Sequence, residues 1–242
     1  MITAAKPAPA KIDQAADEMM KAGVHFGHKT SKTHPKMRPF VSGVRNTVHV
    51  IDLEKTKEKL VEMAEYLKKL KTEGKTVLMV GTKIQHRSAV KDAAASCGMP
   101  YIIGRWIGGM LTNFGTVSKR LERFKELERQ RLAGEWDRYT KKEIAQIEKE
   151  LVSLEASFGG LKEMTRMPDV VFICDLDVNM LAAKEARRKN IPTIGIVDTD
   201  INPEAVDRFI PANDDAVGSV AYILEKVKEA WKTQNPVPAA VA

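Results

Sequence analysis

The sequence predicts an α/β protein built on a parallel sheet, with helices on both faces and a helical hairpin inserted into it. Short runs that are apolar throughout alternate with segments of helical periodicity, which is the pattern of strands covered on both faces by their connecting helices. The hairpin is predicted because residues 116–158 break this alternation with ten Lys/Arg, nine Asp/Glu and only a narrow apolar stripe.

The elements before the insertion begin with a short helix over Asp13–Ala22, which Gly23 ends. Residues 1–12, rich in Ala, Pro and Lys, are predicted to be disordered, as are residues 235–242. A strand over Thr47–Ile51 leads into a helix that Asp52 caps and Gly74 ends. The alternation then continues with the strand Thr76–Val80, the helix Lys83–Cys97 and the strand Tyr101–Ile103.

The alternation resumes after the insertion. Its strands are predicted over Val170–Cys174, Pro192–Val197 and Arg208–Ala212, and its helices over Asn179–Asn190 and Asp214–Lys232. The α/β domain is therefore discontinuous and comprises residues 19–115 and 159–232.

The insertion, residues 116–158, has the pattern of an antiparallel coiled coil. Its second half repeats apolar residues at 3-4-3-4 spacing, namely Ile144, Ile147, Leu151, Leu154 and Phe158. Val117, Leu121 and Phe124 begin a matching stripe, which Glu128 interrupts. Thr140 and Glu143 form a capping box that starts the second helix, and residues 133–136 reverse the chain. Such a hairpin reaches toward a partner or another domain.

Composition excludes several classes of protein. The 242 residues are 43% hydrophobic and 29% charged, which is typical of a globular protein. No apolar run is long enough for a signal peptide or a membrane span. The two cysteines, Cys97 and Cys174, lie in apolar segments without metal-type spacing, so we expect core residues of a cytoplasmic protein.

Charge is concentrated in one stretch, Met19–Ile51, which we call the basic segment. It holds six Lys/Arg, no acidic residue and four of the five histidines, and so carries almost the whole net charge of +7. This asymmetry predicts contact with a polyanion. The expected RNA-binding residues are Lys29, Lys32, His34, Lys36, Arg38 and Arg45, together with Arg105 from a later loop.

Two motifs suggest phosphate chemistry, and both match only in part. Gly81-Thr82-Lys83 lies between a strand and a helix, but the sequence has no complete phosphate-binding loop. Asp175 and Asp177 follow a strand, as the nucleophile and general acid of haloacid-dehalogenase-type phosphohydrolases do. Asn179 stands where that motif has Thr or Val, and capping of the next helix by Asp177 or Asn179 explains these residues better.

Arg105 opens the segment RWIGGMLTN, at the junction between sheet and hairpin. Its paired glycines allow close approach of the backbone, either to phosphate or to another part of the chain. A binding role for Arg105 and a structural role for Trp106 are compatible.

A metal site is expected at the carboxyl edge of the sheet. Asp198, Asp214 and Asp215 each follow a predicted strand, and His28 of the basic segment could reach them. Imidazole and carboxylates together suit zinc or another divalent ion. Two alternatives stay open: a Lys or Arg of the basic segment neutralises the carboxylates, or Asp214 caps the last helix while the histidines contact RNA.

Several long motifs in series resemble the bacterial ribosomal protein S2 family. They are AGVHFGH (Ala22–His28), PKMRPF (Pro35–Phe40), VHVIDLEKT (Val48–Thr56), VGTK (Val80–Lys83), RWIGGMLTNF (Arg105–Phe114), IPTIGIVDT (Ile191–Thr199) and PANDDA (Pro211–Ala216). The resemblance extends in order from about Met19 to Ala230.

The resemblance implies a flavodoxin-like sheet with an inserted coiled-coil hairpin and no enzymatic activity or required cofactor. It implies a structural constituent of the small ribosomal subunit that binds small-subunit ribosomal RNA and neighbouring ribosomal proteins. It also implies a docking platform for the mRNA-binding ribosomal protein one, in support of translation. The alternatives are a metal-dependent phosphohydrolase built on Asp175 and Asp177, and a stand-alone RNA-binding module.

Overall fold

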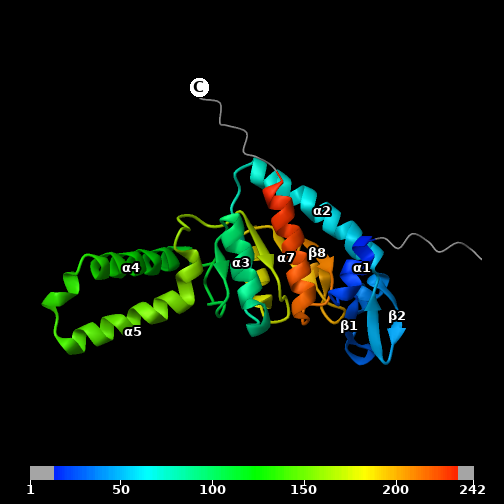
Figure 1. Cartoon of the computed structure of the whole chain (residues 1–242), viewed down its shortest axis with the longest axis horizontal. Coiled ribbons are helices and arrows are strands. Elements are labelled where there is room, and N and C mark those ends of the chain that lie inside the picture. Colours follow the sequence, from blue (N-terminus) through cyan, green and yellow to red (C-terminus); the bar gives the residue numbers. More distant parts are fainter. Residues whose placement is uncertain (1–13, 234–242) are drawn as a thin grey trace, which may run out of the picture.

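The computed structural model describes residues 14–233. A parallel sheet with helices on both faces forms its centre, between a small antiparallel sheet at one end and a long helical pair at the other (Figure 1). The predicted disordered tails, residues 1–12 and 235–242, lie outside the described residues. Within residues 14–233, no helix is both long and apolar enough to cross a membrane.

The central sheet has five parallel strands in the order β5-β4-β6-β7-β8. This order is that of the flavodoxin-like fold, so the predicted parallel sheet with helices on both faces is confirmed. The strands are β4 (Val77–Val80), β5 (Tyr101–Ile102), β6 (Val170–Ile173), β7 (Thr193–Val197) and β8 (Arg208–Pro211). Each lies within one residue of its predicted bounds.

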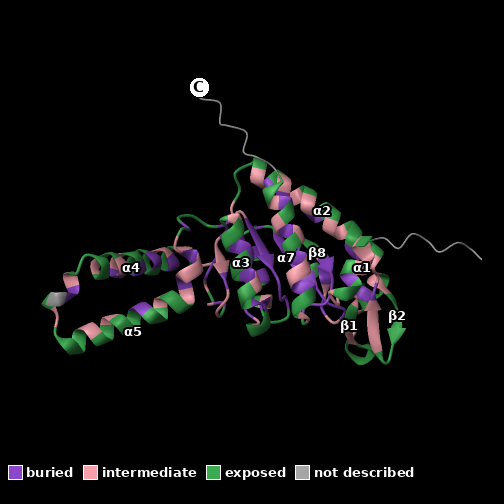
Figure 2. Ribbon diagram, viewed as in Figure 1, coloured by how far each residue is buried: buried purple, intermediate pink, exposed green. Residues whose placement is uncertain are grey.

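Alternate residues of the strands enter two separate cores. Val77 and Met79 of β4 pack with one helical layer, whereas Leu78 and Val80 pack with the other. The first layer consists of α2 (Leu53–Thr72), α3 (Arg87–Cys97) and α7 (Val217–Lys232), with α1 (Gln14–Lys21) packed beside them. The second contains α6 (Met180–Arg188) and the base of the helical pair. Figure 2 shows the buried strands between these layers.

Two helices start later than predicted, because polar side chains bind the backbone just before them. α3 begins at Arg87, after the 3-10 turn η3 (Ile84–His86), and Lys83, whose backbone nitrogen donates to Asp175, is not helical. α7 begins at Val217, because Asn213 Oδ1 accepts hydrogen bonds from the backbone nitrogens of Asp215 and Ala216. Capping by Asp214 is therefore wrong.

The basic segment forms an antiparallel sheet of which only the last strand was predicted. Its strands, in spatial order, are β1 (Phe26–Lys29), β3 (Val48–Ile51) and β2 (Val41–Arg45), with the 3-10 turns η1 (Thr30–Lys32) and η2 (Pro35–Phe40) between β1 and β2. Asn46 and Thr47 join β2 to β3 with φ of 50° and 65°. A turn of this type usually has Gly at its second position. Because Thr47 occupies that position, the sequence did not predict the turn.

The insertion folds as two antiparallel helices, α4 (Phe114–Leu132) and α5 (Lys141–Phe158) (Figure 1). The predicted capping box of Thr140 and Glu143 is present at the start of α5. The reversal contains Gly134 with φ of 68° and the 3-10 turn η4 (Glu135–Arg138). Two further 3-10 turns are η5 (Gly159–Leu161) and η6 (Pro203–Ala205).

Candidate nucleic-acid interface and carboxyl-edge cluster

The cations of the basic segment face solvent. Lys29, Lys32, Lys36, Arg38 and Arg45 are all exposed. Lys36 forms an ion pair with Glu204, so part of its charge is already neutralised. The other four form no ion pair with any described carboxylate.

His34 has a defined hydrogen-bonding state. Its Nδ1 accepts a hydrogen bond from the backbone nitrogen of Lys36 at 3.3 Å, so the proton of the neutral ring lies on Nε2. The half-buried ring therefore keeps one donor. Arg105 is also exposed, but it follows β5, at the opposite end of the strand order from the loops that hold the basic segment.

Thr199, directly after β7, anchors the basic segment to the central sheet. Its Oγ1 accepts a hydrogen bond from the backbone nitrogen of His28, and its carbonyl accepts one from the backbone nitrogen of His34, both at 2.8 Å. A Cβ on Gly27 would lie 2.6 Å from Thr199 Cγ2. Only glycine permits so close an approach.

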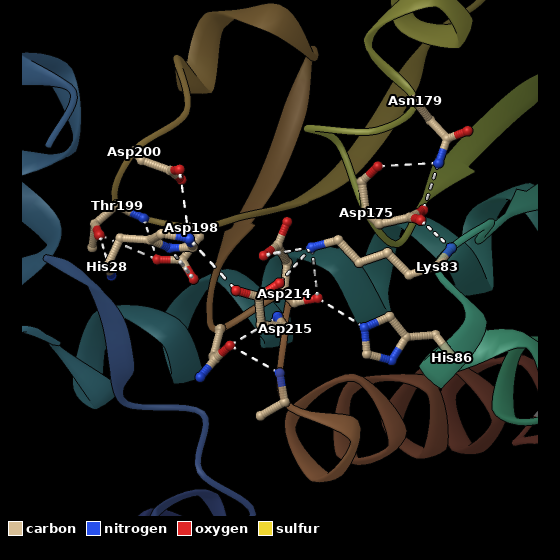
Figure 3. Close-up of polar contacts among 12 residues, drawn as sticks. His28, Lys83, His86, Asp175, Asn179, Asp198, Thr199, Asp200, Asp214 and Asp215 are labelled. Carbon is tan, nitrogen blue, oxygen red and sulfur yellow. Dashed lines mark hydrogen bonds and ion pairs between the residues drawn. The ribbon is translucent and has the colours of Figure 1, made fainter. Parts of the chain in front are cut away.

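His28 lies among three carboxylates at the carboxyl edge of the sheet (Figure 3). Its Nδ1 is 3.2 Å from Asp198 Oδ2, and its Nε2 is 3.6 Å from Asp200 Oδ2 and 3.5 Å from Asp215 Oδ2. The Nδ1–Asp198 contact is an ion pair without the alignment of a hydrogen bond. Asp198 raises the pKa of His28 to about 9.

The predicted metal ligands are only partly brought together. His28 and Asp198 are adjacent, but the third group with a donor atom within 4.8 Å of both is Asp200, which the sequence analysis missed. Asp214 and Asp215 pair with Lys83 Nζ, at 3.1 and 2.8 Å, and the other oxygen of Asp215 is the one that lies 3.5 Å from His28. The expected neutralisation by lysine therefore occurs for these two carboxylates, although the lysine follows β4 and is not in the basic segment.

Asp214 is the most perturbed carboxyl group of this edge. Burial raises its pKa to about 7; Lys83 opposes that change, and the charge of Asp198 adds to it. His86 Nε2 lies 2.8 Å from the Asp214 carbonyl oxygen and fixes the backbone there. Burial also raises the pKa of Asp200.

Asp175 fills the point between β4 and β6 where the strand order reverses, which is the usual ligand crevice of this fold. Its Oδ2 accepts hydrogen bonds from the backbone nitrogens of Thr82 and Lys83 at 2.9 and 2.7 Å. Asn179 Nδ2 donates to its Oδ1 at 2.7 Å. The carboxylate, 0% exposed, takes the position at which backbone amides would bind a phosphate.

These contacts contradict a phosphohydrolase reading of Asp175 and Asp177. The predicted nucleophile is fully buried with both oxygens occupied, and Asp177 is exposed. Capping by Asn179 is also wrong: it is the N-cap residue of α6, but its side chain makes no capping bond and holds Asp175 instead.

The RWIGGMLTN segment has a structural partner, Glu185 of α6. The buried carboxylate accepts hydrogen bonds from Trp106 Nε1 and from the backbone nitrogens of Gly109, Leu111 and Thr112. Burial alone would raise the pKa of Glu185, but these donors hold it below its usual value. Gly109 of the glycine pair thus donates to an internal carboxylate, whereas Arg105 is exposed.

Comparison with known proteins identifies the chain. Asp175 occupies the switch point of a flavodoxin-like sheet, the antiparallel sheet of the basic segment exposes its cations, and a helical pair projects from the domain. The model of the family described as "Ribosomal protein S2" matches residues 19–233. The small ribosomal subunit protein uS2 of Tolumonas auensis is 44% identical over 224 residues, covering 93% of each chain. The chain therefore belongs to the ribosomal protein S2 family, a family of structural ribosomal proteins that need no cofactor.

Proposed function

We propose that the chain binds small-subunit ribosomal RNA through its basic segment and provides a docking platform for the mRNA-binding ribosomal protein one. Family membership implies ribosomal RNA and other small-subunit proteins as partners in the cytoplasm. The observation that carries RNA binding is a set of exposed cations that form no ion pair with residues 14–233: Lys29, Lys32, Arg38 and Arg45.

Phosphate contact explains this arrangement better than reading of bases. Exposed Lys and Arg side chains release condensed counterions when they meet phosphates, which gives affinity that falls steeply with salt. The His34 Nε2 proton adds one neutral donor beside them. Arg105, at the other end of the strand order, supplies a separate contact.

A fourfold alanine variant of Lys29, Lys32, Arg38 and Arg45 tests the proposal. Binding to small subunits depleted of this protein is measured by co-sedimentation over a range of salt concentrations. We expect at least tenfold weaker binding and a logarithmic salt slope reduced by roughly three to four, since each phosphate contact contributes about one.

The matched control removes the same charge from the helical pair. Lys119, Lys125, Lys142 and Lys149 are exposed and form no ion pair among residues 14–233, so their replacement by alanine changes net charge equally. Equal losses from the two variants would refute the assignment of the interface to the basic segment.

We propose that the docking platform is a groove between α1, α2 and α7. This groove of about 320 Å³ has an apolar floor and a basic rim. Its floor includes Met19, Leu60, Val61, Ala64 and Tyr222, and its rim includes Lys57, Lys68 and Lys226. Glu229 also lines the groove and pairs with Lys226 at 3.0 Å, so Lys57 and Lys68 supply its net positive charge. An apolar groove with two such lysines suits an amphipathic helix that carries acidic residues.

Val61→Asp tests the groove, because Val61 is 53% exposed and lines it. We expect the variant to enter small subunits normally but to retain less ribosomal protein one. Val178→Asp is the control, since Val178 is 57% exposed and lies outside the groove. Normal retention by Val61→Asp would exclude the groove as the docking site.

The inserted pair is proposed to be a coiled-coil arm. Val117, Leu121, Phe124 and Leu127 of α4 are buried on one side, and Ile144, Ile147, Leu151 and Leu154 of α5 pack into the same core. This seam supports heptad packing. The rest of the surface of both helices is charged and exposed, so it can contact other components of the small ribosomal subunit.

A further inference from the structure

We propose that the exposed face of α6 is a second surface for RNA phosphates, formed by Lys184, Arg187, Arg188 and Lys189. We call these four residues the α6 cations. Three of them lie in the helix Met180–Arg188, and Lys189 is its C-cap residue. This second interface rests on the proposed binding to ribosomal RNA, and it lies outside the basic segment.

The α6 cations are exposed, and their charges have no carboxylate partner. All four residues are exposed. Lys184, Arg188 and Lys189 form no ion pair with any residue in the range 14–233. Arg187 donates a hydrogen bond to the carbonyl oxygen of Glu204, which carries no charge. Four positive charges are therefore available to a ligand.

The acidic residues of this part of the chain do not neutralise the face. Glu185 is the one acidic residue between positions 178 and 192. It is buried, and its carboxylate accepts hydrogen bonds from Trp106 and from the loop before α4. Asp177 precedes the opposite end of the helix. The exposed face of α6 thus presents cations without a carboxylate of its own.

The helix dipole explains only part of this arrangement. It favours cations in the last turn, which holds Arg187 and Arg188. Lys184 lies a turn earlier, three and four residues before these arginines, and so shares a face with them. Like charges at these spacings destabilise a helix. An anionic ligand across the face would remove this repulsion.

Glu204 of η6 joins the α6 cations to the basic segment. Its carboxylate pairs with Lys36, and its carbonyl oxygen accepts from Arg187. The two sets of cations therefore border one another, with a single carboxylate between them. A continuous basic surface of this kind is complementary to a polyanion. The guanidinium groups of α6 can also bind phosphate through two parallel hydrogen bonds.

A triple alanine variant of Lys184, Arg188 and Lys189 tests this interface. The residues are exposed and alanine favours a helix, so the melting temperature should not change. Binding to small subunits depleted of this protein is measured by co-sedimentation at several salt concentrations. We expect at least about fivefold weaker binding and a logarithmic salt slope reduced by roughly two to three, since each phosphate contact contributes about one. Hydroxyl-radical footprinting should show RNA positions that lose protection.

Two controls separate charge from other effects. The variant Lys184→Arg, Arg188→Lys, Lys189→Arg keeps all three charges and should bind as the unmodified protein does.

Replacement of Lys119, Lys125 and Lys142 by alanine removes the same charge from exposed positions of the helical pair. This variant should retain the RNA protections that the α6 alanine variant loses. Loss of the same protections in both variants would overturn the proposal, because net charge would then be the cause.

Unchanged binding, salt slope and footprint in the α6 alanine variant would also overturn it. Weaker binding with every RNA protection intact would do the same, since α6 would then contact an acidic protein. If the fourfold variant of the basic segment binds weakly and the α6 variant binds normally, the α6 interface alone is refuted. The reverse result would support the α6 interface and refute the role proposed for the basic segment.

Discussion

Trp106 and Glu185 are hydrogen-bonded across 79 positions of the sequence, with Nε1 donating to Oε1 at 3.2 Å. The same carboxylate holds three backbone nitrogens of the loop between β5 and α4. One buried acid therefore fixes the junction from which the helical pair projects.

Replacing Glu185 by alanine should lower the free energy of unfolding by about 3 kcal/mol, because several buried donors lose their acceptor. Glu185→Gln keeps one acceptor oxygen and should cost less. Glu148→Ala, at an exposed position of α5, should change stability by less than about 0.5 kcal/mol. Urea titrations of the three variants measure these differences; similar stability of Glu185→Ala and Glu148→Ala would contradict the assigned role.

Replacing Gly27 by alanine should loosen the basic segment. The added Cβ would lie 2.6 Å from Thr199 Cγ2, an overlap that costs about 1–3 kcal/mol. Hydrogen exchange at the backbone amides of His28 and His34 should become faster. Gly43→Ala is the control in the same segment, since a Cβ there meets nothing within 4 Å; unchanged exchange in Gly27→Ala would show that the anchor tolerates the overlap.

Deletion of residues 116–158 with a short glycine linker tests the proposed domain boundaries. We expect a less stable α/β domain that still unfolds cooperatively, because the sheet keeps the layer of α2, α3 and α7. The shortened chain should assemble poorly into small subunits. Loss of cooperative unfolding would instead show that the α/β domain needs the core residues Phe124 and Phe158 in order to fold.

In metal-free protein, stability should fall as pH rises from about 6.5 to 9. The pKa of His28 is raised to about 9 in the folded state. The ion pairs of the protonated ring therefore stabilise the folded state fully at pH values below the pKa of the unfolded state, near 6.5. This contribution to the free energy of unfolding disappears as the pH rises through the pKa of His28 in the folded state. The expected loss is of order 1–3 kcal/mol. His28→Gln should flatten this part of the stability profile, and an unchanged profile would exclude His28 as its source.

The central sheet was predictable because its strands are buried on both faces and therefore uniformly apolar. The antiparallel sheet was not predictable, because β1 and β2 contain glycine, β1 is half exposed and β2 is mostly exposed. Neither an apolar periodicity nor a buried run therefore identifies them. The sequence predicted a cluster of His28 with carboxylates at this edge of the sheet, but it did not predict that Asp200 and Lys83 belong to the cluster. Topology places Asp198 and Asp214 at one edge, but only side-chain packing decides that Lys83 takes Asp214 while Asp200 turns to His28.

The two hydrogen bonds to Thr199 close residues 28–34 into a ring, and Lys29 and Lys32 project from it. The conformational entropy of this loop is thus lost during folding and is not lost again when a ligand binds. Its charges meet a polyanion at a fixed spacing. Such preorganisation favours RNA whose phosphates already match that spacing, so discrimination can come from the shape of the RNA alone.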